Sequence, residues 1–494
     1  MFSLLKFLFR FICWLLVLTL LVAAFAWLAN RKDEALLPEV AQALTFTPPS
    51  AEAMQRNAYF VFLGLGVPAD EDAQAAAARF FVAQMKESTN YQKTGESKFI
   101  SIEAWPYPPI DKGIFVLLCR RGSDDCPKYW LTRQADVRIV LERYAHVLQR
   151  YWSQLDRPEY EEIIPPYARL ALSQYDDLTT ASDLVLMQAT MLMHEGNAAQ
   201  ALSLLERNAR LHQRLMAGSR QLVGAMNALS MQVRQQHIVS QLLLHHPALA
   251  RTHAAQWRAA LAARPADLSA ALAGEGRSML RMIDHTYKSQ SSQFASVSSV
   301  FDESYPNAPL KKALAISKDF LLQKFGLHHT TLNHYYRAYR MTAGLADVPA
   351  DQFDAYMARM MRELPVTSQP WWRRPYFGLR NWRGYMTNNI FLGVGVGQLY
   401  VRSYIERTHD AEGHRRLVLL QLAAYSAGIA PKDMPAWLAK SPMELRNPYT
   451  RAPMGWETGN AQVKTGGSLV FQGRQEQSQN PARSSVYRVP IFAP

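Results

Sequence analysis

Cysteine, charge and recognisable catalytic motifs are all scarce in this chain. Only three of the 494 residues are Cys, at positions 13, 119 and 126. Charged residues make up 19% of the chain and hydrophobic residues 49%. This balance excludes a largely disordered protein, because disorder accompanies low hydrophobicity and high net charge. The sequence therefore predicts a folded protein, with a length that fits two to four domains of about 100–200 residues.

The common signatures of catalysis are missing. His194-Glu195 is followed by Gly-Asn-Ala, so no second His lies one helical turn later, as a zinc protease requires. No Gly-x-Ser-x-Gly elbow occurs. Gly393-Val-Gly-Val-Gly397 is not followed by a third loop glycine at the spacing of a phosphate-binding loop, and no clear strand precedes it, so close helix packing explains it better. We therefore predict no catalytic residues and no cofactor.

Histidines group at 245–246 and at 328–329 with His334. His329 and His334 are five residues apart, which places them on different faces of a helix. We interpret these groups as surface or partly buried helix histidines, and we predict no metal site.

Cys119 and Cys126 flank a short polar loop, Arg-Arg-Gly-Ser-Asp-Asp, which contains turn-forming residues. An oxidising compartment would make the pair a disulfide, whereas a reducing one would leave two thiols. A metal site is the weaker alternative, because two Cys without a nearby His supply too few ligands. The compartment predicted below favours a disulfide.

The N-terminal segment is strongly apolar. Residues 11–30 carry no charge and have basic residues on both sides, and about 20 apolar residues are enough for a membrane-spanning helix. We predict that residues 1–34 are an uncleaved signal anchor, with a short N-terminal tail inside and the large domain outside. Ala24-Phe25-Ala26 has the small-x-small form of a cleavage site, so a cleaved signal peptide remains the alternative.

Hydrophobic periodicity predicts a mainly α fold. We expect an irregular, solenoid-like helical domain with a small α+β N-terminal part and a short C-terminal β hairpin. The expected segments are a transmembrane anchor (1–34), a Pro-rich tether (35–50), a small α+β region with Cys119 and Cys126 (51–175), a helical domain (176–364), an aromatic and Arg-rich segment (365–385), and a helical pair followed by a turn and hairpin (386–494).

Several elements can be placed more closely. Apolar residues at helical spacing predict one amphipathic helix over 137–151, and His194-Glu-Gly-Asn predicts a turn before a helix from Ala198. Two helices are expected at 388–404 and 414–427, joined by Thr408-His-Asp-Ala-Glu-Gly. Short strands are expected at 113–119, 468–471 and 486–489.

The best candidate contact surface is the run from Trp371 to Tyr385. Its interleaved Arg and aromatic residues suit anionic headgroups, glycans or a protein hot spot. An aromatic loop packed between helices fits the pattern equally well. The candidate binding residues are Trp371, Trp372, Arg373, Arg374, Arg380, Trp382 and Arg383.

The C-terminal block resembles that of an uncharacterised family of bacterial single-pass, inner-membrane-anchored envelope proteins. The likeness rests on Asn388, Gly393, Tyr404 and Arg407, on the helix at 415–422, and on the turn Asn447-Pro-Tyr-Thr-Arg-Ala-Pro453. The Cys pair and the start at Asn57-Ala-Tyr59 also fit. In this chain Arg451 stands where Gly is more usual. The resemblance implies an inner-membrane anchor and a periplasmic main domain, and it implies no particular reaction.

The leading functional hypothesis is a membrane-anchored envelope scaffold that binds a protein partner and has no catalytic activity. A cell-wall glycan hydrolase is the alternative, with Glu87-Ser and Glu303-Ser as its only candidate acids. The formal net charge of +13 allows a third hypothesis, a binder of nucleic acid or anionic lipid if the domain is cytoplasmic. The predicted orientation makes nucleic acid an improbable partner and leaves anionic lipid or glycan open.

Overall fold

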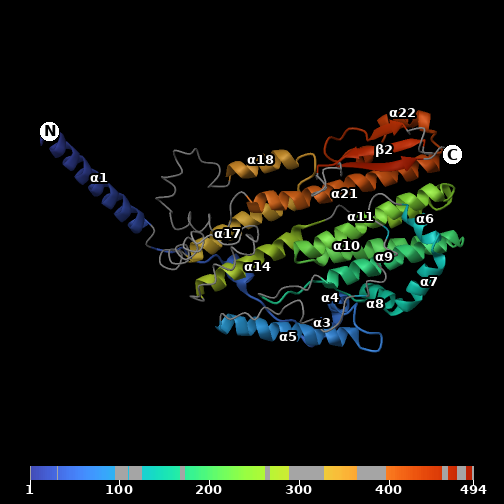
Figure 1. Ribbon diagram of the computed structural model, residues 1–494, viewed down its shortest axis with the longest axis horizontal. Helices are drawn as coiled ribbons and strands as arrows, with labels where there is room; N and C mark the ends of the chain where they lie inside the picture. The colour runs from blue at the N-terminus through green and yellow to red at the C-terminus, as the bar shows by residue number, and fades with distance from the viewer. Residues whose placement is uncertain are drawn as a thin grey trace. The chain divides into compact units, whose positions relative to one another are not determined.

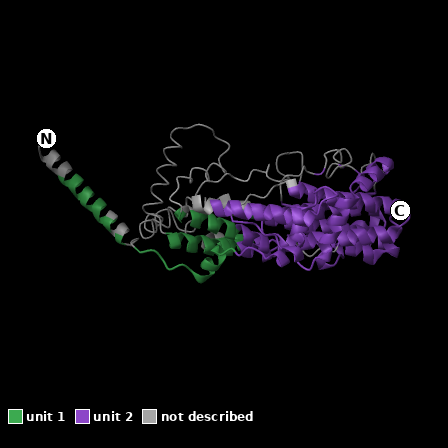
Figure 2. Ribbon diagram, turned by 90° about the horizontal axis from the view of Figure 1, so that it is seen from below, with its two compact units in different colours: residues 1–46, 276–342, 355–401 green, residues 47–275, 343–354, 402–494 purple. Residues whose placement is uncertain are grey.

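A computed structural model describes residues 2–29, 32–94, 110, 119, 125–166, 173–261, 267–288, 328–363, 396–458, 466–474 and 485–491. Helices dominate these residues, and a small antiparallel sheet lies near the C-terminus (Figure 1), so the mainly α prediction is confirmed. The chain divides into two compact units (Figure 2). Unit 1 comprises residues 1–46, 276–342 and 355–401, and unit 2 comprises 47–275, 343–354 and 402–494.

Among the described residues, helices follow one another along the chain and a small three-stranded sheet follows them near the C-terminus. The α-helices are α1 (Phe2–Ala29), α2 (Pro38–Leu44), α3 (Ala51–Arg56), α4 (Ala58–Leu63), α5 (Ala73–Thr94), α6 (Cys126–Leu131), α7 (Gln134–Arg143), α8 (Ala145–Asp156), α9 (Ser173–His194), α10 (Ala198–Gly218), α11 (Leu222–His245), α12 (Leu249–Thr252), α13 (Ala254–Ala260), α14 (Ser269–Lys288), α17 (His328–Ala343), α18 (Phe353–Glu363), α21 (Val396–Ala427) and α22 (Met434–Ala439). Short 3-10 helices are η3 (Gly344–Asp347), η4 (Pro431–Asp433) and η5 (Met443–Leu445), and the strands are β1 (Gly455–Thr458), β2 (Gly467–Gln472) and β3 (Val486–Ile491).

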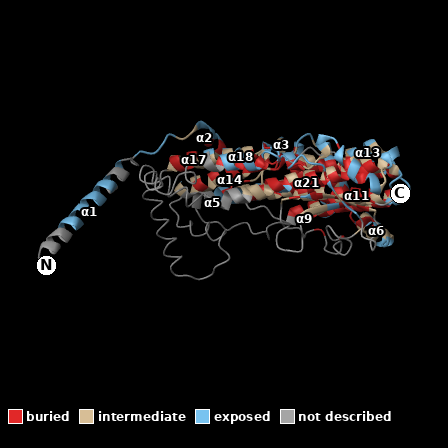
Figure 3. Cartoon of the chain, turned by 90° about the horizontal axis from the view of Figure 1, so that it is seen from above, coloured by how far each residue is buried: buried red, intermediate tan, exposed pale blue. Residues whose placement is uncertain are grey.

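In unit 1, α1 exposes its apolar side chains. Among the side chains described in it, Trp14 is 74% exposed, Leu20 67% and Leu18 60%. Figure 3 shows the described part of α1 in the colour of exposed residues. The search for a membrane-spanning helix, made over the described residues alone, finds none of sufficient length and apolarity.

Unit 1 has a small apolar core of its own. Val40 and Ala43 of α2 are buried against Leu280 and Ile283 of α14 and Leu332 of α17. Pro38 begins α2, a position where a missing amide hydrogen costs nothing. Residues 35–50, expected to form a Pro-rich tether, thus contain a packed helix.

The core of unit 2 is built on α9, α10 and α11. In α9 the four consecutive residues 184–187 are fully buried, which identifies a helix covered on all sides. The turn expected at 194–197 is present, with Gly196 at φ +86°, and α10 begins at Ala198. Gly is suited to this turn because positive φ costs it little.

The amphipathic pattern over 137–151 belongs to two helices instead of one. α7 ends at Arg143 and α8 begins at Ala145, and Tyr144 between them has φ −104° and ψ +21°. Val137, Leu148 and Tyr151 are nevertheless buried as the spacing predicted. The break leaves the apolar face intact, so the periodicity could not reveal it.

The prediction of two separate helices, at 388–404 and 414–427, is wrong, because α21 runs without a break from Val396 to Ala427. Gly413, taken as part of a joining loop, lies inside the helix against the Phe471 ring. A Cβ atom at position 413 would come within 2.3 Å of that ring. Gly413 therefore serves close packing. α21 ends where expected, at Ala427, and the next residue, Gly428, has φ +67°.

The sheet has the order β1-β2-β3 with antiparallel pairing. The expected strands at 468–471 and 486–489 lie in β2 and β3, and Leu469 pairs with Val489. Leu469 and Phe471 are buried and Val470 between them is partly exposed, so the burial alternates along β2. The expected two-stranded hairpin is extended by β1, whose mostly exposed residues carry no such alternation.

In the expected α+β region, 51–175, the described residues form helices and one isolated parallel bridge, Asn57 to Glu159. The strand expected at 113–119 lies outside the described residues except for Cys119.

Candidate functional site

The disulfide expected between Cys119 and Cys126 is present. The two Cα atoms are 5.5 Å apart, and the residues are 5% and 4% exposed. The bridge closes a loop whose far end begins α6, where Asp125 accepts a hydrogen bond from the Lys128 amide at 3.2 Å. Asp is a favoured residue at this position because its carboxylate accepts from an otherwise unpaired helix amide.

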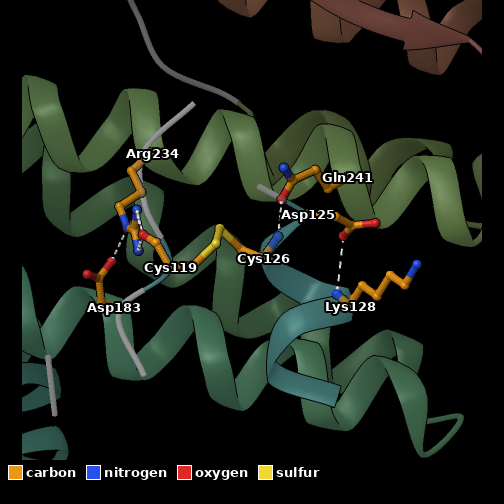
Figure 4. Close-up of a disulfide and its surroundings, with 7 residues drawn as sticks. All are labelled: Cys119, Asp125, Cys126, Lys128, Asp183, Arg234 and Gln241. Atoms are coloured by element: carbon orange, nitrogen blue, oxygen red, sulfur yellow. Dashed lines mark hydrogen bonds and ion pairs between the residues drawn. A yellow bond between two sulfur atoms is a disulfide. The ribbon is translucent and has the colours of Figure 1, made fainter. Parts of the chain in front are cut away.

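A buried ion pair holds the disulfide against α9 and α11 (Figure 4). The Arg234 guanidinium pairs with the Asp183 carboxylate, and each side chain is 6% exposed. Arg234 also donates two hydrogen bonds to the Cys119 carbonyl, each at 3.3 Å. Removing one partner of such a pair leaves an uncompensated charge in the core. We call Cys119, Cys126, Asp183 and Arg234 the disulfide clamp.

The second cysteine is held from α11 as well. The Cys126 amide donates to Gln241 Oε1 at 3.2 Å, and His245 Nε2 lies 2.7 Å from the Asp125 carboxylate. Partial burial acts to raise the pKa of Asp125, but the hydrogen bonds from His245 and the Lys128 amide outweigh it and lower the pKa. The disulfide is therefore attached to α11 at both ends.

A buried polar network superficially resembles a catalytic pair. His212 Nε2 lies 3.0 Å from Ser182 Oγ and 3.3 Å from the Tyr151 hydroxyl, and that hydroxyl donates to Asn208 Oδ1 at 2.6 Å. His212 and Asn208 are 0% exposed and Ser182 is 1% exposed. Burial lowers the pKa of His212 to about 3. A catalytic base must reach the proton it abstracts from a substrate, so this network serves structure.

Glu162 is the most deeply buried carboxylate whose pKa is raised, and burial is the main cause. It accepts hydrogen bonds from the Tyr175 hydroxyl and from the amides of Arg220 and Gln221, the latter at 2.6 and 2.9 Å. Both amides directly precede α11, where backbone donors lack helical partners. Both carboxylate oxygens accept hydrogen bonds from these three groups, so Glu162 fixes the start of α11.

The C-terminal turn that carried the family resemblance is a compact hydrogen-bonded structure. Asn447 Oδ1 accepts from the Tyr449 amide at 2.9 Å, and the Asn447 amide donates to the Ala452 carbonyl at 2.9 Å. Arg451 has φ +60°, a conformation that favours Gly. Arg451, which stands where Gly is more usual in the similar family, thus occupies a position where Gly would relieve backbone strain.

Tyr449 fastens this turn to α21. Its hydroxyl donates to Asp410 Oδ1 at 2.6 Å, and the Arg474 guanidinium lies 4.2 Å from the centre of its ring. Burial, followed by the Asp410 charge, raises the pKa of Tyr449. Arg474 in turn pairs with Asp354 at 2.8 Å. These contacts are structural, and each of the polar groups is used within the protein.

The predicted contact residues Trp371, Trp372, Arg373, Arg374, Arg380, Trp382 and Arg383 lie outside the described residues, and so does Glu303. Glu87 is exposed on α5. Within the part of the chain that the structure describes, no group of three or more His, Cys, Asp or Glu side chains could hold a metal ion.

Sequence reasoning missed the ion pair of the disulfide clamp. The available signal was weak: Asp183 directly precedes the apolar run Leu-Val-Leu-Met, where a charged residue is rarely buried without a partner, whereas Arg234 stands among Gln and His residues that do not mark it as buried. The sequence could not pair them, because they are 51 residues apart.

Comparison with known proteins adds no relative. No protein-family model, no curated protein and no solved structure matches this chain. The likeness to single-pass envelope proteins therefore remains an expectation.

Proposed function

We propose that this protein is a non-catalytic scaffold or partner-binding protein of the bacterial envelope. Residues 1–34 would anchor it in the inner membrane, with the N-terminus in the cytoplasm and the main domain in the periplasm. The observation that carries the proposal is the disulfide clamp, because a buried disulfide in a large domain is typical of an oxidising compartment.

Two further observations support the same compartment and role. The described apolar side chains of α1 are exposed to solvent in the isolated chain, and an extended apolar surface of this kind suits contact with lipid or another protein. The polar groups of unit 2 that resemble catalytic residues, Ser182, His212 and Glu162, are sealed in the core. A scaffold requires a rigid domain of this kind and does not require an accessible base.

The alternatives receive less support. A glycan hydrolase needs two carboxyl groups placed about the scissile bond, one with a raised pKa, whereas Glu87 is exposed on a helix. A cytoplasmic nucleic-acid binder would keep its cysteines reduced. The predicted partner-binding segment at 365–385 is retained as part of the proposal on sequence grounds.

The compartment is tested by alkylating thiols in intact cells and in membranes, with and without reductant. We expect the full-length chain in the membrane fraction, with Cys119 and Cys126 alkylated only after reduction. A Cys119→Ser/Cys126→Ser variant identifies any signal from Cys13. Free reaction of both cysteines, or recovery of the chain in the soluble fraction, would contradict the proposed location.

The binding role is tested with a photo-crosslinker introduced beside Trp371. We expect a discrete crosslinked species that disappears when Trp371, Arg373, Arg374 and Trp382 are replaced by Ala, while the circular dichroism spectrum is unchanged. Replacing Arg138 and Ile139, which are exposed in unit 2, provides a matched control. Crosslinking that persists in the fourfold variant would remove this segment as the binding site.

A further inference from the structure

The chain that follows α1 is bonded to the start of α17. Asp33 Oδ1 accepts hydrogen bonds from the Thr330 amide at 2.9 Å and from the Thr330 hydroxyl at 2.8 Å, and Oδ2 accepts from the His329 amide at 2.8 Å. A carboxylate at this position satisfies unpaired amides and interacts favourably with the helix dipole. Asp33 is therefore the N-terminal cap of α17, although the two are nearly 300 residues apart in sequence.

Asn333 binds the next residues of the same segment. Its Nδ2 donates to the Ala35 carbonyl at 2.9 Å and to Glu34 Oε2 at 3.1 Å, while its Oδ1 accepts from the Leu37 amide at 3.0 Å. Asn333 is 1% exposed. A buried amide with all these partners holds a backbone segment in one register.

The chain that follows Leu37 is also bound to the rest of unit 1. α2 buries Val40 and Ala43 in the core of unit 1, and Arg281 of α14 donates to the Thr45 carbonyl at 2.8 Å. We call residues 33–46 the latch. Because it is fixed at successive points over its whole length, it cannot act as a flexible tether.

Chain length then limits how far the latch can lie from a membrane anchor. The uncharged run ends at Asn30, so Asp33 is three residues later, and an extended chain covers about 10 Å over that distance. The C-terminus of α14 lies at the same end of unit 1, because Asp284 is 3.0 Å from His328 and the Tyr287 ring stacks on His328 at 4.8 Å.

We infer that the N-terminus of α17 and the C-terminus of α14 form a surface that lies against the lipid headgroups of the anchoring membrane. This inference rests on the proposed membrane anchor. The described side chains at this surface are polar and charged, as contact with headgroups requires: Lys32 is exposed, and the Lys288 side chain is 66% exposed while it pairs with Asp284. The nearby carboxylates of Asp33 and Asp284 are occupied, by the amides of α17 and by Lys288 at 2.8 Å.

The inference is tested with the full chain reconstituted into vesicles of phosphatidylethanolamine and phosphatidylglycerol that carry a nitroxide on some headgroups. A fluorophore is attached at Lys288→Cys in a Cys13→Ala background. The matched control carries it at Ser278→Cys, an exposed position ten residues earlier in α14, which is about 15 Å away along the helix. We expect the nitroxide to quench the fluorophore at 288 at least about twofold more strongly than the fluorophore at 278, because the two positions are about 15 Å apart along the helix.

Two insertions distinguish a latch from a tether. A Gly/Ser segment of about 12 residues, with a root-mean-square length of about 19 Å, is placed either between Lys32 and Asp33 or between the exposed residues Thr47 and Pro48. Only the first separates the latch from the anchor. We therefore expect the first insertion to reduce quenching at 288 to the level at 278, and the second to leave it unchanged.

The outcomes separate the inference from the proposal beneath it. Equal effects of the two insertions would mean that residues 33–46 act as a tether, which overturns the inference. Unquenched fluorophore at 288 in protein that floats with the vesicles would also overturn it while leaving the anchor intact. Protein that does not float with the vesicles would remove both the anchor and the inference.

Discussion

The buried histidine at position 212 should make unit 2 sensitive to acid. His212 is 0% exposed, and burial lowers its pKa to about 3, against about 6.5 in an unfolded chain. A group whose pKa is lowered on folding stabilises the native state above its unfolded pKa. That contribution is lost progressively as the pH falls from about 6.5 toward about 3, because the unfolded chain binds the proton first.

The size of the effect follows from the two pKa values. Between about pH 7 and about pH 4.5 the unfolded His becomes protonated while His212 in the native state does not. Each pH unit below 6.5 costs about 1.4 kcal/mol, so two units remove ~3 kcal/mol from the free energy of unfolding. Net stabilities of domains are only about 5–15 kcal/mol, so this one residue matters.

The His212→Gln variant isolates the effect, since Gln can bond Ser182 but does not titrate. Its free energy of unfolding is compared with that of the unaltered chain by urea denaturation in detergent at both pH values. We expect the variant to be less stable at pH 7 and to recover ~3 kcal/mol relative to the unaltered chain at pH 4.5. His194→Gln, which removes an exposed histidine, is the control. Equal destabilisation by His212→Gln at both pH values would refute the reasoning.

Three further predictions concern the clamp and the C-terminal turn. Arg234→Met should lower the free energy of unfolding by about 3–5 kcal/mol, because it leaves the Asp183 charge buried and unpaired. In urea denaturation, adding Asp183→Leu should restore much of this loss. A double variant that loses the sum of the two single losses would contradict the pairing. Replacing Cys119 and Cys126 by Ser should cost about 2–3 kcal/mol, the loop-entropy value for so short a loop, and a reductant should then have no effect on the variant's denaturation midpoint. Arg451→Gly should be more stable than Arg451→Ala by about 1 kcal/mol because position 451 has positive φ, as thermal melts of the two variants would reveal; equal melting temperatures would argue against strain there.

Features that depend on neighbouring residues were predictable from the sequence. The pairing of Cys119 with Cys126 was predictable from their short spacing together with the expected oxidising compartment. The short apolar run at 468–471 predicted β2, and the turn-forming residues at 194–197 predicted the turn at Gly196. In each case the physical cause lies within a few residues, so a sequence pattern can report it.

Features that depend on distant contacts were not predictable. Gly413 has the composition of a turn but lies within α21, because the Phe471 ring occupies the space of its missing Cβ. Asp33 belongs to a charged cluster next to an apolar run and gives no sign that it caps α17. β1 has mostly exposed residues and forms only because β2 is available to pair with it. Tertiary contacts override local propensity in all three cases.

The buried polar groups also bear on the choice between a scaffold and an enzyme. Arg234 holds the Cys119 carbonyl, Glu162 holds the amides before α11, and Tyr151 joins α8 to Asn208 of α10. Each of these three side chains is hydrogen-bonded to another element of the protein, and such bonds restrict the motion of the helices that they join. An active site would instead direct polar groups toward a space that a substrate can enter. These polar side chains of unit 2 position helices, which supports the scaffold role that we propose.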